Sequence, residues 1–130
     1  MDSAAQDRRP TVLIVEDDEA IRRLLALSLR VAGFDTVEAG DGLSAIALLE
    51  RSPVDVVVLD LMLPGFDGFV VRDEIAAQPM TRHIPVIIVT GSEKPVTAVS
   101  PNGVLRKPVT PEQVVATVKR CLGEASRAAR

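Results

Sequence analysis

The sequence contains no tryptophan and no tyrosine, and its only cysteine is Cys121. A single cysteine cannot form an internal disulfide, and the missing aromatics argue against a base-stacking surface for nucleic acid. The net charge of −3 provides no basic footprint for nucleic acid either. No apolar run reaches membrane-spanning length, and residues 1–10 lack the apolar core of a signal peptide. We therefore expect a cytoplasmic protein that neither inserts into a membrane nor contacts nucleic acid directly.

At 130 residues, of which 47% are hydrophobic, the chain is long enough for one domain around a single core. Short apolar runs rich in valine and isoleucine alternate with segments of helical periodicity. The predicted strands are residues 11–15, 34–39, 54–60, 85–89 and 103–106. Because strands alternate with helices, the pattern predicts an α/β fold whose parallel sheet is covered on both faces.

Helix-capping residues stand where the predicted helices begin. Asp18, Asp41 and Asp67 each lie next to such a start, and we expect them to act as caps or solvated turns rather than in chemistry. Thr110 precedes a proline and is followed three positions later by Gln113. This arrangement is a capping box and predicts that the last helix begins there.

The first helix is expected to bury one face and to end at a glycine. Ile21, Leu24 and Leu25 fall at helical spacing on the predicted buried face, whereas Arg22 lies off it. Gly33 is placed to end this helix.

Polar segments bound the predicted domain. Residues 1–9 predict a flexible N-terminal arm, residues 10–123 the domain itself, and residues 124–130 a polar C-terminal end. Cys121 falls on the core face of the last helix and is expected to be buried. Gly123 is placed to close that helix, and a frayed continuation into the polar end is also consistent with the pattern.

Polar residues that can do chemistry follow four of the predicted strands. Glu16 and Asp17 follow the first strand and Asp60 closes the third. Thr90 follows the fourth strand and Lys107 the fifth. The carboxyl ends of parallel strands share one edge of the sheet, where ligands bind in open α/β folds. These five side chains are therefore expected to converge on one site.

Three carboxylates in one small site repel one another, which raises a pKa or requires a cation. Oxygen ligands with room for water suit Mg²⁺. Asp60 can then act as a nucleophile, as in enzymes that form an aspartyl phosphate. The Lys107 ammonium would neutralise charge on a transferring phosphoryl group, and the Thr90 hydroxyl could donate a hydrogen bond to it.

The segments that carry this chemistry are VEDD at residues 15–18, DLMLPGFDG at residues 60–68, Thr90-Gly91 and Lys107-Pro108. From about Thr11 to Gly123, the chain resembles a response-regulator receiver domain of bacterial two-component signalling. The resemblance implies a flavodoxin-like (CheY-like), doubly wound sheet of five parallel strands in the order 2-1-3-4-5. It also implies a Lys107–Pro108 peptide bond that is commonly cis in this family.

The resemblance further implies that Asp60 accepts a phosphoryl group from a histidine kinase or a histidine phosphotransfer protein. Thr90 and Lys107 would bind that group. The implied Mg²⁺ ligands are Glu16, Asp17, Asp60 and the backbone carbonyl of Met62. Such a domain catalyses only its own phosphorylation and dephosphorylation, and is not otherwise an enzyme.

Two features depart from the family pattern. Val104 stands three positions before Lys107, where the family usually has an aromatic residue that rotates on activation. The crossover between Gly91 and Gly103 is short and contains Pro95 and Pro101. We therefore expect the fourth helix to be reduced to about one turn or replaced by a loop.

Three functions remain open at the level of sequence. The favoured one is a stand-alone receiver, monomeric or weakly dimeric on phosphorylation, that signals to a separate protein of unknown identity or relays the phosphoryl group. The second is a receiver-like interaction module that is never phosphorylated. The third is a phosphatase that resembles haloacid-dehalogenase-type hydrolases. Those enzymes carry a second Asp two positions after the nucleophile, where this chain has Met62.

Overall fold

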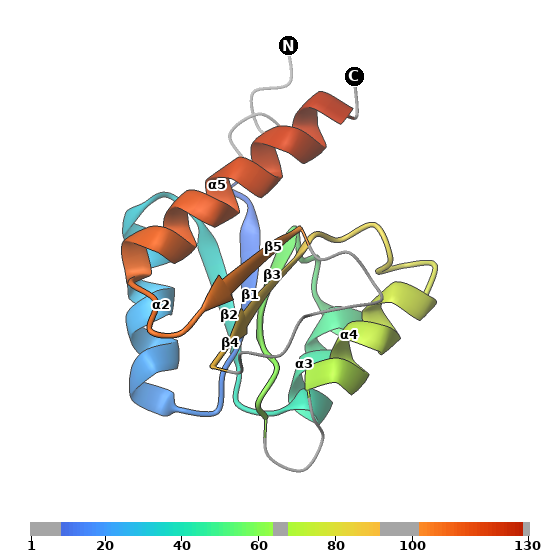
Figure 1. Cartoon of the computed structure of the whole chain (residues 1–130). Helices are drawn as coiled ribbons and strands as arrows, with labels where there is room; N and C mark the ends of the chain where they lie inside the picture. Colours follow the sequence, from blue (N-terminus) through green and yellow to red (C-terminus); the bar gives the residue numbers. More distant parts are fainter. Residues whose placement is uncertain (1–8, 64–67, 92–101, 129–130) are drawn as a thin grey trace.

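The computed structural model describes residues 9–63, 68–91 and 102–128 (Figure 1). The elements of these segments are, in order, β1 (Thr11–Val15), α2 (Glu19–Val31), β2 (Asp35–Ala39), α3 (Gly42–Arg51), β3 (Val56–Asp60), α4 (Gly68–Ala77), β4 (Val86–Thr90), β5 (Gly103–Arg106) and α5 (Pro111–Ala128). Every predicted strand is found, with ends that differ by at most two residues from the prediction.

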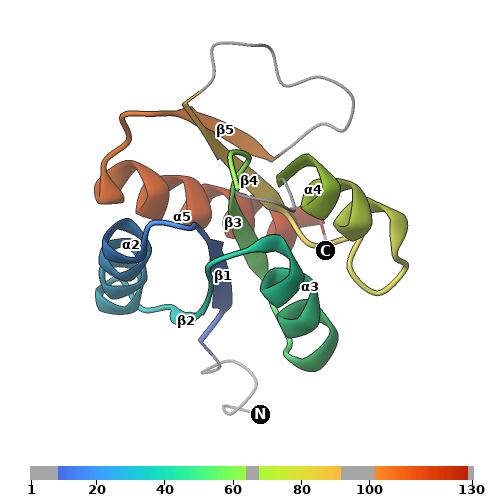
Figure 2. The same cartoon turned by 90° about the horizontal axis from the view of Figure 1, so that it is seen from below.

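The five strands form one parallel sheet in the order β2-β1-β3-β4-β5, as predicted. Figure 2, which views the molecule from below, shows α2 and α5 on one face of the sheet and α3 and α4 on the other. This is the doubly wound, flavodoxin-like arrangement. Because all strands run the same way, their carboxyl ends meet at one edge.

Side chains of the central strands are buried on both faces of the sheet. Val12 and Ile14 of β1 pack with α2 and α5, whereas Leu13 and Val15 pack with α3 and α4. Every residue of β3 and of β4 is buried. The continuous Val/Ile runs in the sequence reflect this two-sided burial, since alternate residues of a strand point to opposite faces.

The predicted caps that lie in the described segments are confirmed. The Asp18 carboxylate accepts a hydrogen bond from the Ile21 amide at 3.0 Å, and Asp41 accepts one from the Ser44 amide at 2.8 Å. At α5, the Thr110 hydroxyl accepts from the Gln113 amide, and the Gln113 side chain accepts from the Thr110 amide. The predicted cap Asp67 lies outside the described residues.

The end of α2 is also as predicted. Gly33 has a φ of 106°, in the left-handed region that side chains disfavour. The Gly33 amide donates to the Arg30 carbonyl at 3.1 Å, and the Phe34 amide donates to the Leu29 carbonyl at 3.0 Å. This pair of bonds is a Schellman motif, which ends the helix.

The predicted buried face of α2 is only partly right. Leu25 is buried as expected, together with Ala26 and Leu29. Ile21 and Leu24, however, are 43% and 51% exposed. Apolar residues extend around much of the circumference of α2, so their spacing alone does not identify the side that faces the sheet.

Of the two possibilities for the last helix, the structure has the longer one, because α5 continues through Gly123 to Ala128. Gly123 therefore does not close the helix. A glycine inside a helix costs about 1 kcal/mol relative to alanine, which the good helix formers on both sides of it can offset. Figure 1 shows the C-terminal part of α5 projecting beyond the sheet.

Arg9, predicted as the last residue of a flexible arm, is attached to the domain. Its guanidinium donates hydrogen bonds to the carbonyl oxygens of Arg30, Gly33 and Phe34 at 2.9–3.1 Å. A cation at this position also suits the negative end of the α2 dipole. These hydrogen bonds join Arg9 to the C-terminal end of α2 and to the residue before β2, contacts that the composition of a short arm does not reveal.

The predicted loss of the fourth helix concerns the crossover between Gly91 and Gly103, and residues 92–101 lie outside the described part of the chain. Val104 lies in β5 and is 38% exposed. The Lys107–Pro108 peptide bond is cis. Cys121 is buried, as expected. None of the helices in the described segments has the length and apolar character needed to cross a bilayer.

Candidate functional site

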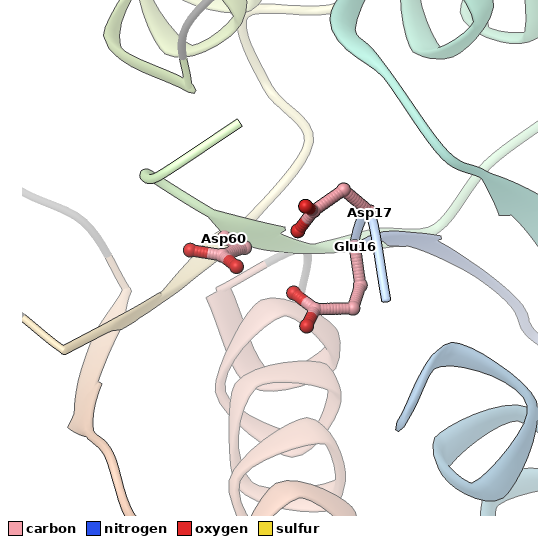
Figure 3. A group of neighbouring side chains, drawn as sticks. All are labelled: Glu16, Asp17 and Asp60. Carbon is pink, nitrogen blue, oxygen red and sulfur yellow. The ribbon is translucent and has the colours of Figure 1, made fainter. Parts of the chain in front are cut away.

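Three acidic side chains meet at the carboxyl edge of the sheet. Glu16 and Asp17 directly follow β1, and Asp60 is the last residue of β3, which pairs with β1. One carboxylate oxygen from each residue lies within 4.8 Å of the others. Glu16 and Asp60 are buried, whereas Asp17 is exposed. Figure 3 shows the three carboxylates gathered around one shared space.

Lys107 brings a positive charge to this group of acids. Its Nζ atom lies 3.0 Å from Asp60 Oδ2 and 3.6 Å from Glu16 Oε1. The Lys107 amide donates a hydrogen bond of 2.8 Å to the carbonyl oxygen of Thr90, which links the ends of β4 and β5. Thr90 itself is the buried last residue of β4. The three acids and the Lys107 ammonium thus meet at the carboxyl edge of the sheet, and Thr90 ends the strand next to β5.

Asp60 is held by a separate donor on each oxygen. Lys107 Nζ contacts Oδ2, and the backbone amide of Met62 donates to Oδ1 at 2.8 Å. The Met62 side chain is 63% exposed, so it does not contribute to the core. These two donors fix the orientation of the Asp60 carboxylate.

The electrostatics of the site differ from one residue to the next. Burial, together with a hydrogen bond to Asp60 and the charge of Asp60, raises the pKa of Glu16 to about 8. Burial also opposes ionisation of Asp60, but hydrogen bonds from Glu16, the Met62 amide and Lys107 prevail and lower its pKa. Lys107 has a raised pKa, since its contacts with Asp60 and Glu16 outweigh its own partial burial.

This donor set fits Mg²⁺. The oxygens of Glu16, Asp17 and Asp60 are hard ligands, and the exposed side of Asp17 leaves access for water. Burial and the neighbouring Asp60 carboxylate keep a proton on Glu16 near neutral pH, and a divalent cation would favour the ionised form of Glu16. The acids can therefore hold a hard cation beside Asp60, while Lys107 contacts both Asp60 and Glu16.

Sequence analysis did not assign Arg22 to this site. The guanidinium of Arg22 donates a hydrogen bond of 2.9 Å to the backbone carbonyl of Glu16. The helical spacing of α2 puts Arg22 off its predicted buried face, which indicates a solvated side chain. The one sequence feature that places Arg22 near the acids is its position one turn into the helix that follows them, and this feature is weak evidence for a role in the site.

An apolar hollow of about 260 Å³ adjoins the acids. The exposed side chains of Ile21 and Leu24 on α2 line it, together with Pro108 from the loop before α5. Asp60 and Lys107 also line this hollow. The Asp60 carboxylate thus lies beside a surface with apolar character.

Comparison with known proteins agrees with this geometry. Residues 12–119 match the model of the response regulator receiver domain family. The sensory transduction protein RegX3 of Mycolicibacterium smegmatis is 38% identical over 117 residues, which are 86% of this chain and 50% of that protein. The response regulator PleD of Caulobacter vibrioides is 42% identical over 79 residues, 61% of this chain and 17% of that protein. The chain therefore spans half or less of the length of these relatives.

Solved structures give the same result for the fold. The chemotaxis response regulator CheY4 of Vibrio cholerae superposes with a TM-score of 0.82 at 29% identity, covering 88% of this chain and 100% of that chain. A receiver domain protein from Methanospirillum hungatei has the same TM-score at 21% identity and supports the fold alone.

Receiver domains bind Mg²⁺ in an acidic pocket and are not enzymes in the usual sense, and response regulators receive phosphoryl groups from histidine kinases. The chain has the fold, an acidic group suited to a metal, and a family match over most of its length. It belongs to the response-regulator receiver domain family of two-component signalling.

Proposed function

We propose that the domain accepts a phosphoryl group on Asp60 from a phosphohistidine of a histidine kinase or histidine phosphotransfer protein, in a reaction that depends on Mg²⁺. The observation that carries this proposal is the position of Asp60 at the end of β3, grouped with two further acids and in contact with the Lys107 ammonium. A nucleophile needs this combination if it is to react with a dianionic phosphoryl group without electrostatic repulsion.

In the proposed step, a carboxylate oxygen of Asp60 forms a bond to phosphorus as the bond between phosphorus and the donor imidazole nitrogen breaks. The imidazole leaves with the electron pair of that bond and takes up a proton from solvent. The lowered pKa of Asp60 keeps it ionised, and therefore nucleophilic, at neutral pH.

The surrounding residues have separate roles in this proposal. Glu16, Asp17, Asp60 and the Met62 backbone carbonyl would hold Mg²⁺, which neutralises charge on the phosphoryl oxygens when bound. Lys107 is placed to pair with a further phosphoryl oxygen after Asp60 has reacted. The hydroxyl of Thr90, at the end of the neighbouring strand β4, would donate a hydrogen bond to the same group.

The output is proposed to be a change in protein–protein interaction or a further phosphoryl transfer. The hollow lined by Ile21, Leu24 and Pro108 offers apolar contacts beside Asp60 for the protein that carries the phosphohistidine. We propose that residues 10–123 form the receiver unit, with Arg9 bound to its edge, and that it is monomeric or weakly dimeric on phosphorylation.

The test is intact-mass analysis after incubation with acetyl phosphate and Mg²⁺. We expect the native chain to gain one phosphoryl group, and the gain to be lost with EDTA and in Asp60→Asn. Asp73→Asn is the matched control, because Asp73 is an exposed acid on α4 remote from the strand ends. Labelling of Asp60→Asn to the level of the native chain would exclude Asp60 as the acceptor.

Two other functions are less well supported. A phosphatase of the haloacid-dehalogenase type needs a proton-transferring side chain two positions after the nucleophile, and the thioether of Met62 cannot transfer a proton. A receiver-like module that is never phosphorylated has no need for the contact of 3.0 Å between Lys107 and Asp60. Turnover of an organic phosphate monoester, or failure of every phosphohistidine donor to label Asp60, would favour these alternatives.

A further inference from the structure

Arg22 connects the loop that carries two of the acids to a neighbouring strand. Its Nη1 atom donates a hydrogen bond of 2.9 Å to the backbone carbonyl oxygen of Glu16. Its Nε atom lies 3.2 Å from Glu38 Oε1 in β2, in an ion pair whose side chains are 16% and 31% exposed. One half-buried guanidinium therefore joins α2, β2 and the residue that follows β1.

The backbone of Glu16 is held from both sides. Its amide donates a hydrogen bond of 3.1 Å to the carbonyl of Ala39, and its carbonyl accepts the bond from Arg22. The Glu16 carbonyl and the Asp17 nitrogen belong to one planar peptide unit. Fixing that carbonyl therefore fixes the direction in which the chain enters Asp17, so that Arg22 constrains both acids of the pair.

Gly40 leaves space for the guanidinium. A Cβ atom on Gly40 would lie 3.2 Å from Arg22 Nη1 and 3.8 Å from Cζ. The first of these distances is shorter than ordinary van der Waals contact, so a methyl group at position 40 would require the atom that bonds to Glu16 to shift slightly. Position 40 thus offers a way to disturb Arg22 without changing any charge.

We propose that Arg22 is a positioning residue of the Mg²⁺ site, which orients Glu16 and Asp17 without touching the ion. Glu38 holds the guanidinium from the opposite side, and Gly40 leaves it room. The inference rests on the proposed function, because it requires that the acids bind Mg²⁺. Groups that orient metal ligands in this way typically contribute about ten- to hundredfold to metal affinity.

Charge and positioning predict opposite effects when Arg22 is replaced. A guanidinium beside the acids repels a divalent cation, so its charge alone weakens Mg²⁺ binding and its removal would tighten binding. If Arg22 orients the acids, its removal would instead weaken Mg²⁺ binding. Arg23 is the matched control, since it carries the same charge at the next position but is 70% exposed and pairs with Glu19.

The experiment is isothermal titration of the full chain with Mg²⁺, for the native protein and its variants. We expect Arg22→Gln to bind about tenfold more weakly, and Gly40→Ala to bind more weakly as well. Arg22→Lys, which keeps the charge but cannot reach both Glu16 and Glu38, should remain weak. Arg23→Gln should bind as tightly as the native chain or slightly more tightly. Thermal unfolding in EDTA, followed by circular dichroism, measures the stability of each variant without the ion.

The outcomes separate the possible roles. Native-like Mg²⁺ affinity in Arg22→Gln overturns the positioning role, even if unfolding in EDTA shifts, because a purely structural residue would behave in that way. If Arg22→Gln does not fold, Arg22→Lys carries the comparison, and native-like affinity in that variant overturns the inference. A native chain that binds no Mg²⁺ overturns the proposed function and the inference with it, so the two failures are distinguishable.

Discussion

A Cβ atom on Gly68 would fall 2.5 Å from the Cα atom of Leu61 and 2.6 Å from the carbonyl oxygen of Asp60. The Gly68 amide also donates a hydrogen bond of 3.1 Å to the Leu61 carbonyl. The first residue of α4 therefore lies directly against the backbone that carries the proposed phosphoryl acceptor. Any side chain at position 68 must push the end of β3 and the start of α4 apart.

Gly68→Ala is expected to affect both stability and phosphorylation. The clash is with backbone, which cannot rotate away, so the free energy of unfolding should fall by about 1–3 kcal/mol. The rate of labelling by acetyl phosphate should also fall, since Asp60 moves relative to Glu16 and Lys107. Urea unfolding should be followed by circular dichroism, because the chain lacks Trp and Tyr.

Gly123→Ala is the control for this change. A Cβ atom on Gly123 meets nothing within 4 Å, and the residue lies inside α5. Alanine there should raise the free energy of unfolding by up to about 1 kcal/mol and leave labelling unchanged. Labelling of Gly68→Ala at the native rate would contradict the argument that this close approach positions Asp60.

The fold could be predicted because its signals are local and repeated. Strands buried on both faces leave continuous apolar runs, such as the one that ends at Asp60, and caps such as Asp18 mark the helices between them. The site could be predicted for a related reason. Parallel strands bring their carboxyl ends together, so Asp17 and Lys107 needed only to follow strands in order to be placed near Asp60.

The features that sequence did not predict depend on contacts between distant segments. Nothing in the residues around Gly68 reveals its close approach to Leu61. Arg9 and Arg22 have the composition of solvated surface, and only the folded chain brings carbonyl groups within reach of their guanidinium groups. Leu24 is exposed although its spacing fits a core position, because several faces of α2 are apolar.

Removing the cap of α5 should cost stability without affecting the site. In Thr110→Ala, the Gln113 amide loses the hydroxyl that accepts its hydrogen bond at 3.2 Å. We expect the free energy of unfolding to fall by about 1 kcal/mol, measured by urea unfolding. Thr110→Ser keeps the hydroxyl and should lie within a few tenths of a kcal/mol of the native value. Equal losses in both variants would show that packing of the Thr methyl group, rather than the cap, is responsible.

Mg²⁺ binding should release a proton near neutral pH. The pKa of Glu16 is raised to about 8, so its carboxyl group is largely protonated at pH 7 and must ionise in order to bind the ion. Mg²⁺ affinity should therefore rise with pH up to about 8, by at most about tenfold per pH unit. Titration calorimetry in two buffers of different ionisation enthalpy measures the released proton.

Glu16→Gln is the control for proton release. An amide at position 16 has no proton to lose in this range, so heats of Mg²⁺ binding should no longer depend on the buffer. Affinity in the variant should be lower than in the native chain but nearly independent of pH. Proton release that persists in Glu16→Gln would assign the titrating group to another residue.

Without Mg²⁺, the same carboxyl group should make the native chain less stable as the pH rises. The pKa of Glu16 is about 8 in the folded chain and 4.5 as the reference value for the unfolded chain. A raised pKa means that the folded state binds the proton more tightly, so this contribution to stability is complete below pH 4.5 and is lost as pH rises to about 8. Asp60, with a lowered pKa, and Lys107, with a raised one, do not titrate within this range.

Comparison with Glu16→Gln isolates this contribution, because the amide resembles the protonated acid but cannot ionise. In EDTA at pH 5 the two proteins should have similar free energies of unfolding. At pH 8.5 the variant should be more stable by about 1–3 kcal/mol. Saturating Mg²⁺ should reverse the order at pH 8.5. The ion binds the folded native chain more tightly than the folded variant, and a tighter-binding ion raises the free energy of unfolding by more. If the native chain is as stable as Glu16→Gln in EDTA at pH 8.5, burial and the neighbouring Asp60 do not raise the pKa of Glu16.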